Sequence, residues 1–345
     1  MSVQVATVTG PVDSRELGLT LAHEHLRNDA RKALVEPAER GLGFLREATV
    51  TPELAWLLRE HPYACLDNCV LDDADAMLAD LAVFKSAGGG TIVDVTPPGL
   101  GSDPAALREL AERSGVRVVM GSGWYLQPYH PPHLAGSDER ALASELITEL
   151  TGTSTTPGVI GEIGVSPDFT PDEQKALRAA ARAQKETGVP LYVHLPGWQR
   201  RAHEVLDIVL GEYGVSPGAV ALCHMDPSGH DVDYQLSVAG RGVWLGFDMI
   251  GMPFRFPGEG RSPSPGDTAR AVAGLIARGH GGQLLLSHDV FLKAMLTRHG
   301  GNGFCYVPAL FLARLAEHGV DSAVAADLLR VNPARLFESA HEGKR

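Results

Sequence analysis

The sequence predicts a (β/α)₈ TIM barrel, and two observations carry that prediction. Eight short, nearly unbroken apolar runs recur along the 345 residues, and a loop and a helix-like stretch follow each of them. Such runs are typical of strands buried on both faces, and parallel strands need crossover helices to connect them. An open, doubly wound sheet is the rival fold, but it would place a glycine-rich phosphate loop after the first strand. The sequence there reads AHEHLRND, which contains no glycine.

The eight predicted strands are short and rich in Val, Ile and Leu. In chain order they cover 20–26, 91–97, 116–125, 158–165, 190–196, 219–225, 243–249 and 283–290. Helices are predicted in the gaps, at about 74–88, 103–114, 137–150, 171–187, 200–213, 231–239, 266–279 and 308–330. Thr170 before Pro171 is a typical helix start, and Gly115 and Gly188 stand where two helices should end.

The segment between the first two strands is longer than an ordinary connection in such a barrel. Residues 27–73 are therefore predicted to form an insertion over the barrel mouth, with one helix near 51–60. No internal repeat or low-complexity linker divides the chain, so residues 1–345 are expected to form a single domain.

Composition excludes several classes of function. The 42 Asp and Glu residues outnumber the 30 Lys and Arg residues, so the net charge is −12 and nucleic acid or an anionic membrane is a poor partner. The chain opens without a signal-like segment, and no apolar run approaches the roughly 20 residues that cross a bilayer. The four cysteines fit no zinc pattern and are expected as free thiols. We therefore expect a cytoplasmic protein whose partner is a small-molecule substrate.

Polar residues that can bind metal ions stand at the ends of five predicted strands. His23 and His25 flank Glu24 in the first strand, and alternation along a strand aims both imidazoles to one face while Glu24 points away. Active sites of such barrels lie at the carboxyl ends of the strands. The other candidate ligands there are Glu162, His194, His224 and Asp289.

Four imidazoles and two carboxylates suit divalent transition metals, with Zn²⁺ as the first choice and Mn²⁺, Fe²⁺ or Co²⁺ as alternatives. Six protein ligands exceed the four of a tetrahedral site, so two ions per chain are predicted. A buried Glu162 would be costly without a cationic partner, which two ions would supply.

The chain resembles the amidohydrolase superfamily, and within it the phosphotriesterase-related proteins. The resemblance runs through TLAHEHL, GSGWY, GVIGEIG, SHDV and VNPARLF, and through His194 and His224 at their strand ends. It implies that His23, His25 and Asp289 bind the more buried metal and that His194 and His224 bind the more exposed one. Glu162 stands where the family has either a carboxylated lysine or a glutamate between both ions, so the chain resembles the glutamate-bridged branch.

The resemblance implies a binuclear hydrolase whose metal-bridging hydroxide attacks a small ester, amide or phosphoester. Asp289 would accept the hydroxide proton and pass it to the leaving group, and Tyr125 would orient a substrate oxygen. A lactonase of the same family and a metal-bearing binding protein without turnover remain alternatives. A mononuclear deaminase or lyase would leave Glu162 without a role. A homodimer is a further expectation from the resemblance.

Residues of the loops are predicted to form the substrate pocket. Met249, Arg255 and Phe291 are the candidates, besides Tyr125. The lactonases carry arginine in an F-D-R-x-G pattern after the seventh strand, whereas this chain has Met249 at that place. Lactones are therefore expected to be poor substrates, and Arg255 or Arg200 would meet the polar end of an ester or amide.

Overall fold

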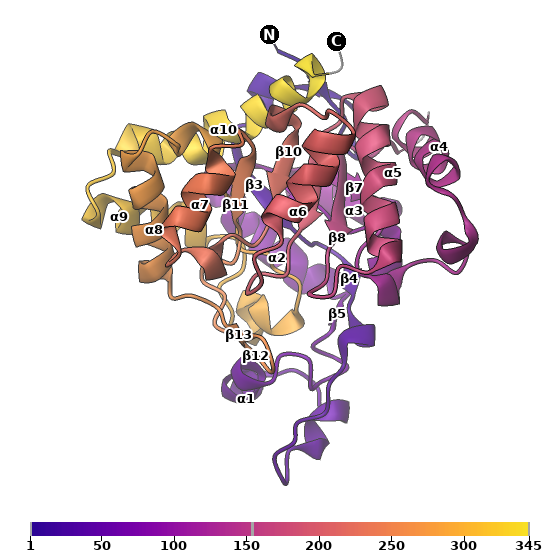
Figure 1. Ribbon diagram of the computed structural model, residues 1–345. Coiled ribbons are helices and arrows are strands. Elements are labelled where there is room, and N and C mark those ends of the chain that lie inside the picture. Colours follow the sequence, from indigo (N-terminus) through magenta and orange to yellow (C-terminus); the bar gives the residue numbers. More distant parts are fainter. Residues whose placement is uncertain (1, 153–154, 344–345) are drawn as a thin grey trace.

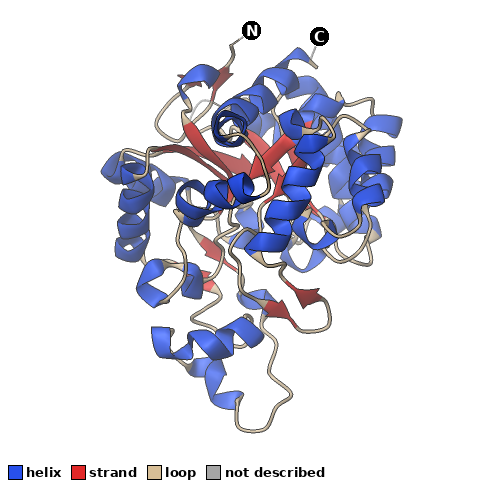
Figure 2. Cartoon of the chain, turned by 90° about the vertical axis from the view of Figure 1, so that its left-hand side faces the viewer, coloured by secondary structure: helices blue, strands red, loops and turns tan. Residues whose placement is uncertain are grey.

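Eight parallel strands form the centre of the protein in the computed structural model, which describes residues 2–152 and 155–343 (Figure 1). In spatial order they are β3, β6, β7, β8, β9, β10, β11 and β14, which is also their order along the chain. Their bounds are Leu19–Glu24, Gly89–Asp94, Arg117–Ser122, Val159–Gly164, Leu191–His194, Val220–Leu222, Trp244–Phe247 and Leu284–Leu286. All eight predicted strands are confirmed, and helices surround them (Figure 2).

The first and last strands of the sheet, β3 and β14, meet through individual hydrogen bonds. The backbone N–H of His23 donates to Ser287 Oγ at 3.1 Å, and the N–H of Asp289 donates to the His23 carbonyl at 3.3 Å. Glu24 points away from the barrel interior, and its carboxylate accepts from the Ser287 hydroxyl and from the N–H of His288. These contacts close the sheet, so the chain is a (β/α)₈ barrel as predicted.

Apolar side chains fill the barrel interior, and the C-terminal helix covers one end of it. Val93, Val119 and Trp244 belong to the cluster of buried residues that also includes Leu336 and Phe337 of α10 (Ser322–Glu342). Because α10 supplies these two side chains, it covers the end of the barrel that is formed by the N-terminal ends of the strands. Both marked chain ends lie on this side of the molecule (Figure 1).

Most of the outer helices follow the predicted ranges closely. They are α2 (Ala74–Ser86), α3 (Pro104–Ser114), α4 (Glu139–Leu150), α5 (Pro171–Thr187), α6 (Ala202–Leu206), α7 (Val232–Ala239), α8 (Pro265–Ala277) and α9 (Leu312–Glu317). Thr170 caps α5 in a reciprocal arrangement with Glu173, and Gly115 and Gly188 end α3 and α5 with φ of 67° and 72°. Ordinary residues avoid that left-handed conformation, which explains glycine at both ends.

Two predicted helices differ from the structure. The single helix predicted over 308–330 is wrong, because the chain breaks between α9 and α10, where Gly319 has φ of 81°. The helix predicted over 200–213 begins as α6 and continues as a wider π-helical turn at Asp207–Glu212. Glycine tolerates a positive φ, so it marks the break that apolar periodicity alone does not reveal.

Residues 27–73 contain little regular structure and extend from the end of the barrel opposite α10 (Figures 1 and 2). Strand β4 (Asn28–Asp29) pairs with β5 (Val70–Leu71) at the base, and α1 (Ala55–Glu60) lies farther out. The Lys293 N–H donates to the Asn68 carbonyl at 3.0 Å, and Asn68 Oδ1 accepts from Ala294 N–H at 2.8 Å. These bonds attach the segment to the loop that follows β14. None of the described helices is long and apolar enough to cross a membrane.

Candidate metal centre

The six predicted metal ligands come together at the carboxyl ends of their strands. His23 lies in β3 and His25 directly after it, Glu162 lies in β8, and His194 is the last residue of β9. His224 and Asp289 follow β10 and β14 by two and three residues. All of them are buried except His194, which is half-buried.

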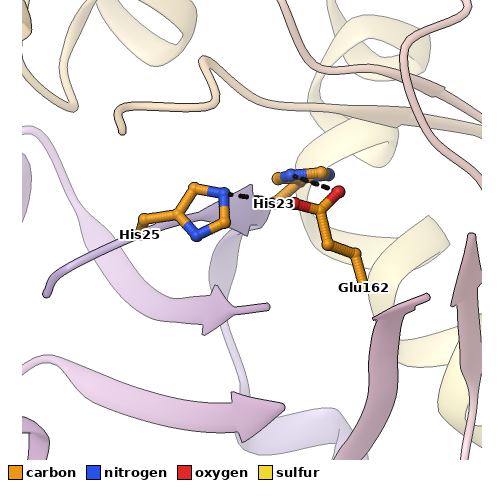
Figure 3. Close-up of side chains that lie close together, drawn as sticks. All are labelled: His23, His25 and Glu162. Carbon is orange, nitrogen blue, oxygen red and sulfur yellow. Dashed lines mark ion pairs between the residues drawn. The ribbon is translucent and has the colours of Figure 1, made fainter. Parts of the chain in front are cut away.

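Glu162 occupies the middle of this group. Its Oε1 lies 3.6 Å from Nε2 of His25, and its Oε2 lies 3.6 Å from Nε2 of His23 (Figure 3). On the other side, Oε2 lies 3.1 Å from Nδ1 of His194 and 3.5 Å from Nε2 of His224. One carboxylate therefore faces all four imidazoles.

A glycine before Glu162 allows the backbone to pass close to the neighbouring strand. Gly161 has φ of 122°, and a Cβ atom there would stand 2.4 Å from the Tyr192 carbonyl oxygen of β9. Any other residue would push β8 away from β9, which carries His194. The sequence GEIG thus fits the close approach that brings Glu162 to the histidines.

Asp289 completes the group on the side of the β3–β14 junction. Its Oδ1 lies 3.1 Å from Nε2 of His25 and 3.5 Å from Nε2 of His23. Asp289 and His224 both adopt a left-handed backbone, with φ of 54° and 60°. Such residues are uncommon outside glycine, and strained backbone is concentrated at functional sites.

Asp248, directly after β11, supports two of the histidines from behind. Its Oδ1 accepts hydrogen bonds from the backbone N–H and from Nδ1 of His224, both at 2.9 Å. Its Oδ2 lies 3.0 Å from Nδ1 of His23. At His224, a carboxylate that accepts from Nδ1 leaves Nε2 as a lone-pair donor, as metal-binding histidines require.

Neighbouring charged groups shift the pKa values of Glu162 and His23 in the direction opposite to that caused by burial. Burial would raise the pKa of Glu162, but His194 and His23 hold it well below the usual range. Burial likewise disfavours a charged His23, yet Cys223, Asp248 and Glu162 raise its pKa. The histidines thus favour the ionised form of Glu162, which carries the negative charge that a cation site needs.

The donor atoms fit divalent metal ions. His23, His25 and Glu162 form one group of ligand atoms within 4.8 Å of one another, and Glu162, His194 and His224 form another. Within the described chain, neither ring nitrogen of the buried His23 has a hydrogen-bond partner, which is costly at Nε2 unless a metal ion accepts its lone pair. Imidazole nitrogen and carboxylate oxygen are the donors that Zn²⁺ and related ions prefer.

Five of the six candidate ligands form the floor of a cavity of about 590 Å³, namely His25, Glu162, His194, His224 and Asp289, whereas His23 lies behind them. Tyr125, Met249, Arg255 and Phe291, which were predicted to form the substrate pocket, all line it. The Tyr125 hydroxyl lies 3.5 Å from Nε2 of His194, and burial raises its pKa well above the usual value, so it stays protonated and can donate a hydrogen bond. The expectation for Arg200 is wrong: it does not line the cavity, and its Nε lies 3.3 Å from Asp231 Oδ2.

Several residues of the cavity were not found from the sequence. Residues 27–73 contribute a run of them, including Glu36, Glu39, His61 and Tyr63. Trp198 and Glu259 line it from the loops that follow β9 and β11. Asp248 could be suspected only from its place at the end of a predicted strand. Nothing in the sequence indicates Tyr63, which is far along the chain from any strand of the barrel.

The family assignment rests on the whole chain. The model of the Phosphotriesterase family matches residues 3–337. The chain belongs to the phosphotriesterase family. It is accordingly a hydrolase of that family, whose members generally bind divalent metals. The clustered donors described above agree with that membership.

Three individual proteins match this chain over nearly its whole length. An N-acetyltaurine hydrolase of Salmo salar is 31% identical, and the match covers 97% of this chain and 98% of that protein. The crystal structure of a resiniferatoxin-binding protein from Rhodobacter sphaeroides is 46% identical with a TM-score of 0.94, and the match covers 97% and 94% of the two chains. The phosphotriesterase homology protein from Escherichia coli is 25% identical with a TM-score of 0.76, and the match covers 93% and 99%.

Proposed function

We propose that this phosphotriesterase-family protein is a binuclear metal-dependent hydrolase that cleaves the amide bond of a small N-acylated amine. The observation that carries the proposal is the position of Glu162 between two groups of histidines on the cavity floor. The full-length likeness to an N-acetyltaurine hydrolase favours an amide over the ester and phosphoester alternatives.

Two divalent ions, with Zn²⁺ as the first choice, would supply a hydroxide nucleophile and polarise the substrate carbonyl. His23, His25 and Asp289 would hold one ion, His194 and His224 the other, and Glu162 both. The distances of 3.1–3.6 Å from Glu162 to the four imidazoles support this assignment.

Asp289 is the proposed proton carrier. It lines the cavity beside His25, so it can take a proton from the attacking water and give it to the amine nitrogen as the carbon–nitrogen bond breaks. The protonated Tyr125 hydroxyl faces the same floor and can donate a hydrogen bond to the substrate carbonyl oxygen. Carboxylic acid and free amine are the products.

The test is a substrate panel with zinc-loaded protein and with protein treated with a chelator. N-acetyltaurine, other N-acetyl amines, an aryl acetate, a lactone and an aryl dialkyl phosphate are assayed by detection of the free amine or alcohol. We expect an amide to reach kcat/KM of about 10⁴ M⁻¹s⁻¹ or more, with loss on chelation. Faster turnover of the lactone or phosphate than of every amide would overturn the proposal.

One observation favours a second function, ligand binding without turnover. The relative from Rhodobacter sphaeroides at 46% identity is described as a binding protein. Incubation of each panel compound with an equal amount of zinc-loaded protein separates the two functions. Recovery of tightly bound, unchanged compound after a day would favour the binding protein, whereas release of amine would favour the hydrolase.

A further inference from the structure

One wall of the cavity consists of aromatic rings that the proposed chemistry does not use. Tyr63, Trp198, Phe256 and Phe291 form this aromatic wall. The centroid of the Phe256 ring lies 5.8 Å from that of Tyr63 and 5.5 Å from that of Trp198. The Tyr63 and Phe291 centroids are 6.2 Å apart. These separations are typical of aromatic pairs in contact, so the four rings form one continuous surface.

Four separate segments supply the aromatic wall. Tyr63 comes from the 27–73 segment, Trp198 follows β9, Phe256 lies in β12 (Arg255–Phe256), and Phe291 follows β14. Gly260 of the strand paired with β12 packs directly on the indole, because a Cβ atom there would stand 2.0 Å from Trp198 Nε1. The rings are therefore held by packing against several elements rather than by one loop.

The cavity is larger than an acetyl group and a two-carbon amine need. Cavities of roughly 300–1,000 Å³ hold drug-sized ligands, and this one has about 590 Å³. The metal-ligand candidates and Tyr125 take up the floor, so the aromatic wall borders space beyond the scissile bond. Tyr63, Trp198 and Phe291 remain only half-buried and present ring surface to that space.

The charges around this space disfavour an anionic group. Arg255 is the one Lys or Arg among the described residues that line the cavity, and it is exposed on β12. Glu259 lines it as well, and so do Glu36 and Glu39, which lie 3.5 Å from Arg46 and His61 respectively. Burial raises the pKa of Glu259, and no salt bridge to Glu259 is present in the part of the chain described. A carboxylate or sulfonate placed here would lie near the carboxyl group of Glu259 and would have only Arg255 as a nearby guanidinium or ammonium partner among the described lining residues.

We infer that the aromatic wall is a binding subsite for an aryl group that the substrate carries beyond its scissile amide and that bears no negative charge. The inference rests on the proposed function for the position of the amide at the floor. Edge and face contacts with four rings would bind an aryl group, and burial of its apolar surface would supply the affinity.

Hydroxamic acids test the subsite without relying on turnover, because they bind divalent metal ions through two oxygens. The dissociation constants of acetohydroxamate and phenylacetohydroxamate are measured by calorimetry with the zinc-loaded full-length protein. We expect phenylacetohydroxamate to bind about 30-fold more tightly or better, from the apolar area that a phenyl ring buries. We expect 4-carboxyphenylacetohydroxamate to bind at least about 10-fold more weakly than phenylacetohydroxamate.

Variants of the aromatic wall locate the effect. Phe256→Ala or Phe291→Ala should reduce the ratio of the two dissociation constants to below about five-fold. Phe44→Ala is the matched control, because Phe44 lies in the 27–73 segment, is 55% exposed and does not line the cavity. The control should keep the full preference.

The outcomes separate failure of the inference from failure of the proposed function. Equal binding of the methyl and phenyl compounds to the wild-type protein would overturn the inference alone. Tighter binding of the carboxylated compound would also overturn it. No binding of acetohydroxamate to zinc-loaded protein would overturn the proposed metal centre and the inference together. Should Phe256→Ala fail to fold, the wild-type preference and Phe291→Ala still decide the matter.

Discussion

The carboxylate of Asp226 accepts a hydrogen bond from the backbone N–H of Asp248 at 2.9 Å, beside the ends of the neighbouring strands β10 and β11. Both side chains are buried, and they titrate very differently. Burial, followed by repulsion from Asp248, raises the pKa of Asp226 to about 7. His224 and His23 overcome the effect of burial on Asp248 and lower its pKa. Asp248 is thus the charged member of the pair, and it faces two histidines of the site.

Asp248→Asn is expected to weaken metal binding by about 10–100-fold, the usual cost of losing a carboxylate behind a metal-binding histidine. Both proposed ions should be affected, because His23 and His224 are the proposed ligands of different ions. Chelator competition with zinc measures the affinity of each site. Asp207→Asn is the control, since Asp207 is exposed and forms an ion pair with Arg241 at 3.2 Å, away from the histidines. Unchanged affinity in Asp248→Asn would show that the two histidines are oriented without it.

Glu162→Gln should reduce the metal content to one ion or fewer per chain. The amide keeps the shape of the side chain but loses the charge that lies among the four imidazoles. Elemental analysis of purified protein gives the metal content, with Glu149→Gln as a control outside the site. Two ions per chain together with normal turnover would exclude Glu162 as the bridging ligand.

Asp289→Asn should lower kcat by about 10²–10⁴-fold, the usual contribution of a general acid–base group. Its carboxylate lies 3.1 Å from His25, so part of the loss could come from weaker metal binding. The metal content of the variant is therefore measured beside its kinetics. A variant with both ions bound and near-normal kcat would remove Asp289 from the proposed mechanism.

Lactones are expected to be poor substrates. Met249 lines the cavity at the place where the lactonases of the family carry an arginine, so a lactone would meet an apolar side chain there. Kinetics with a series of lactones tests this expectation. A lactone with kcat/KM near 10⁶ M⁻¹s⁻¹, a value usual for a proper substrate, would make lactonase the primary function.

Asp67→Asn is expected to cost about 1–3 kcal/mol of stability at pH 7, because Asp67 accepts hydrogen bonds from the buried Lys293 and from the Val50 N–H. Burial would raise the pKa of Asp67, but these two bonds lower it overall. Its contribution is therefore present above the unfolded pKa of about 3.9 and is lost as the pH falls through the lower folded pKa.

Urea unfolding of both proteins at pH 7 and near pH 3 measures this contribution. The difference in stability between wild type and Asp67→Asn should be large at pH 7 and smaller at the acidic pH. A difference that stays constant over this range would mean that the charge of Asp67 does not stabilise the attachment of residues 27–73 to the barrel.

The sequence predicted the barrel and the clustering of the candidate ligands well, for the same physical reason. Strands buried on both faces must be almost wholly apolar, so a histidine or carboxylate at the end of such a run stands out. Alternation along β3 explains why His23 and His25 both face Glu162 while Glu24 turns toward Ser287. These relationships are local, or they follow from the common direction of parallel strands.

Long-range packing explains what the sequence did not reveal. Arg200 turns toward Asp231 and the ring of Tyr234, which lie beyond the next strand, and so it is absent from the cavity. Tyr63 reaches the cavity because hydrogen bonds attach residues 27–73 to the loop after β14. Neither position follows from periodicity, because partners distant in sequence decide both.

The junction between β3 and β14 determines when the two ligand groups can form during synthesis. Glu162, His194 and His224 come from three successive strands and are all present once about two thirds of the chain has been made. His23 and His25 must wait for Asp289, which is translated 264 residues after His25 (289 − 25). A ribosome-bound chain therefore acquires the set that includes Asp289 only after its last strand has emerged and the ring has closed.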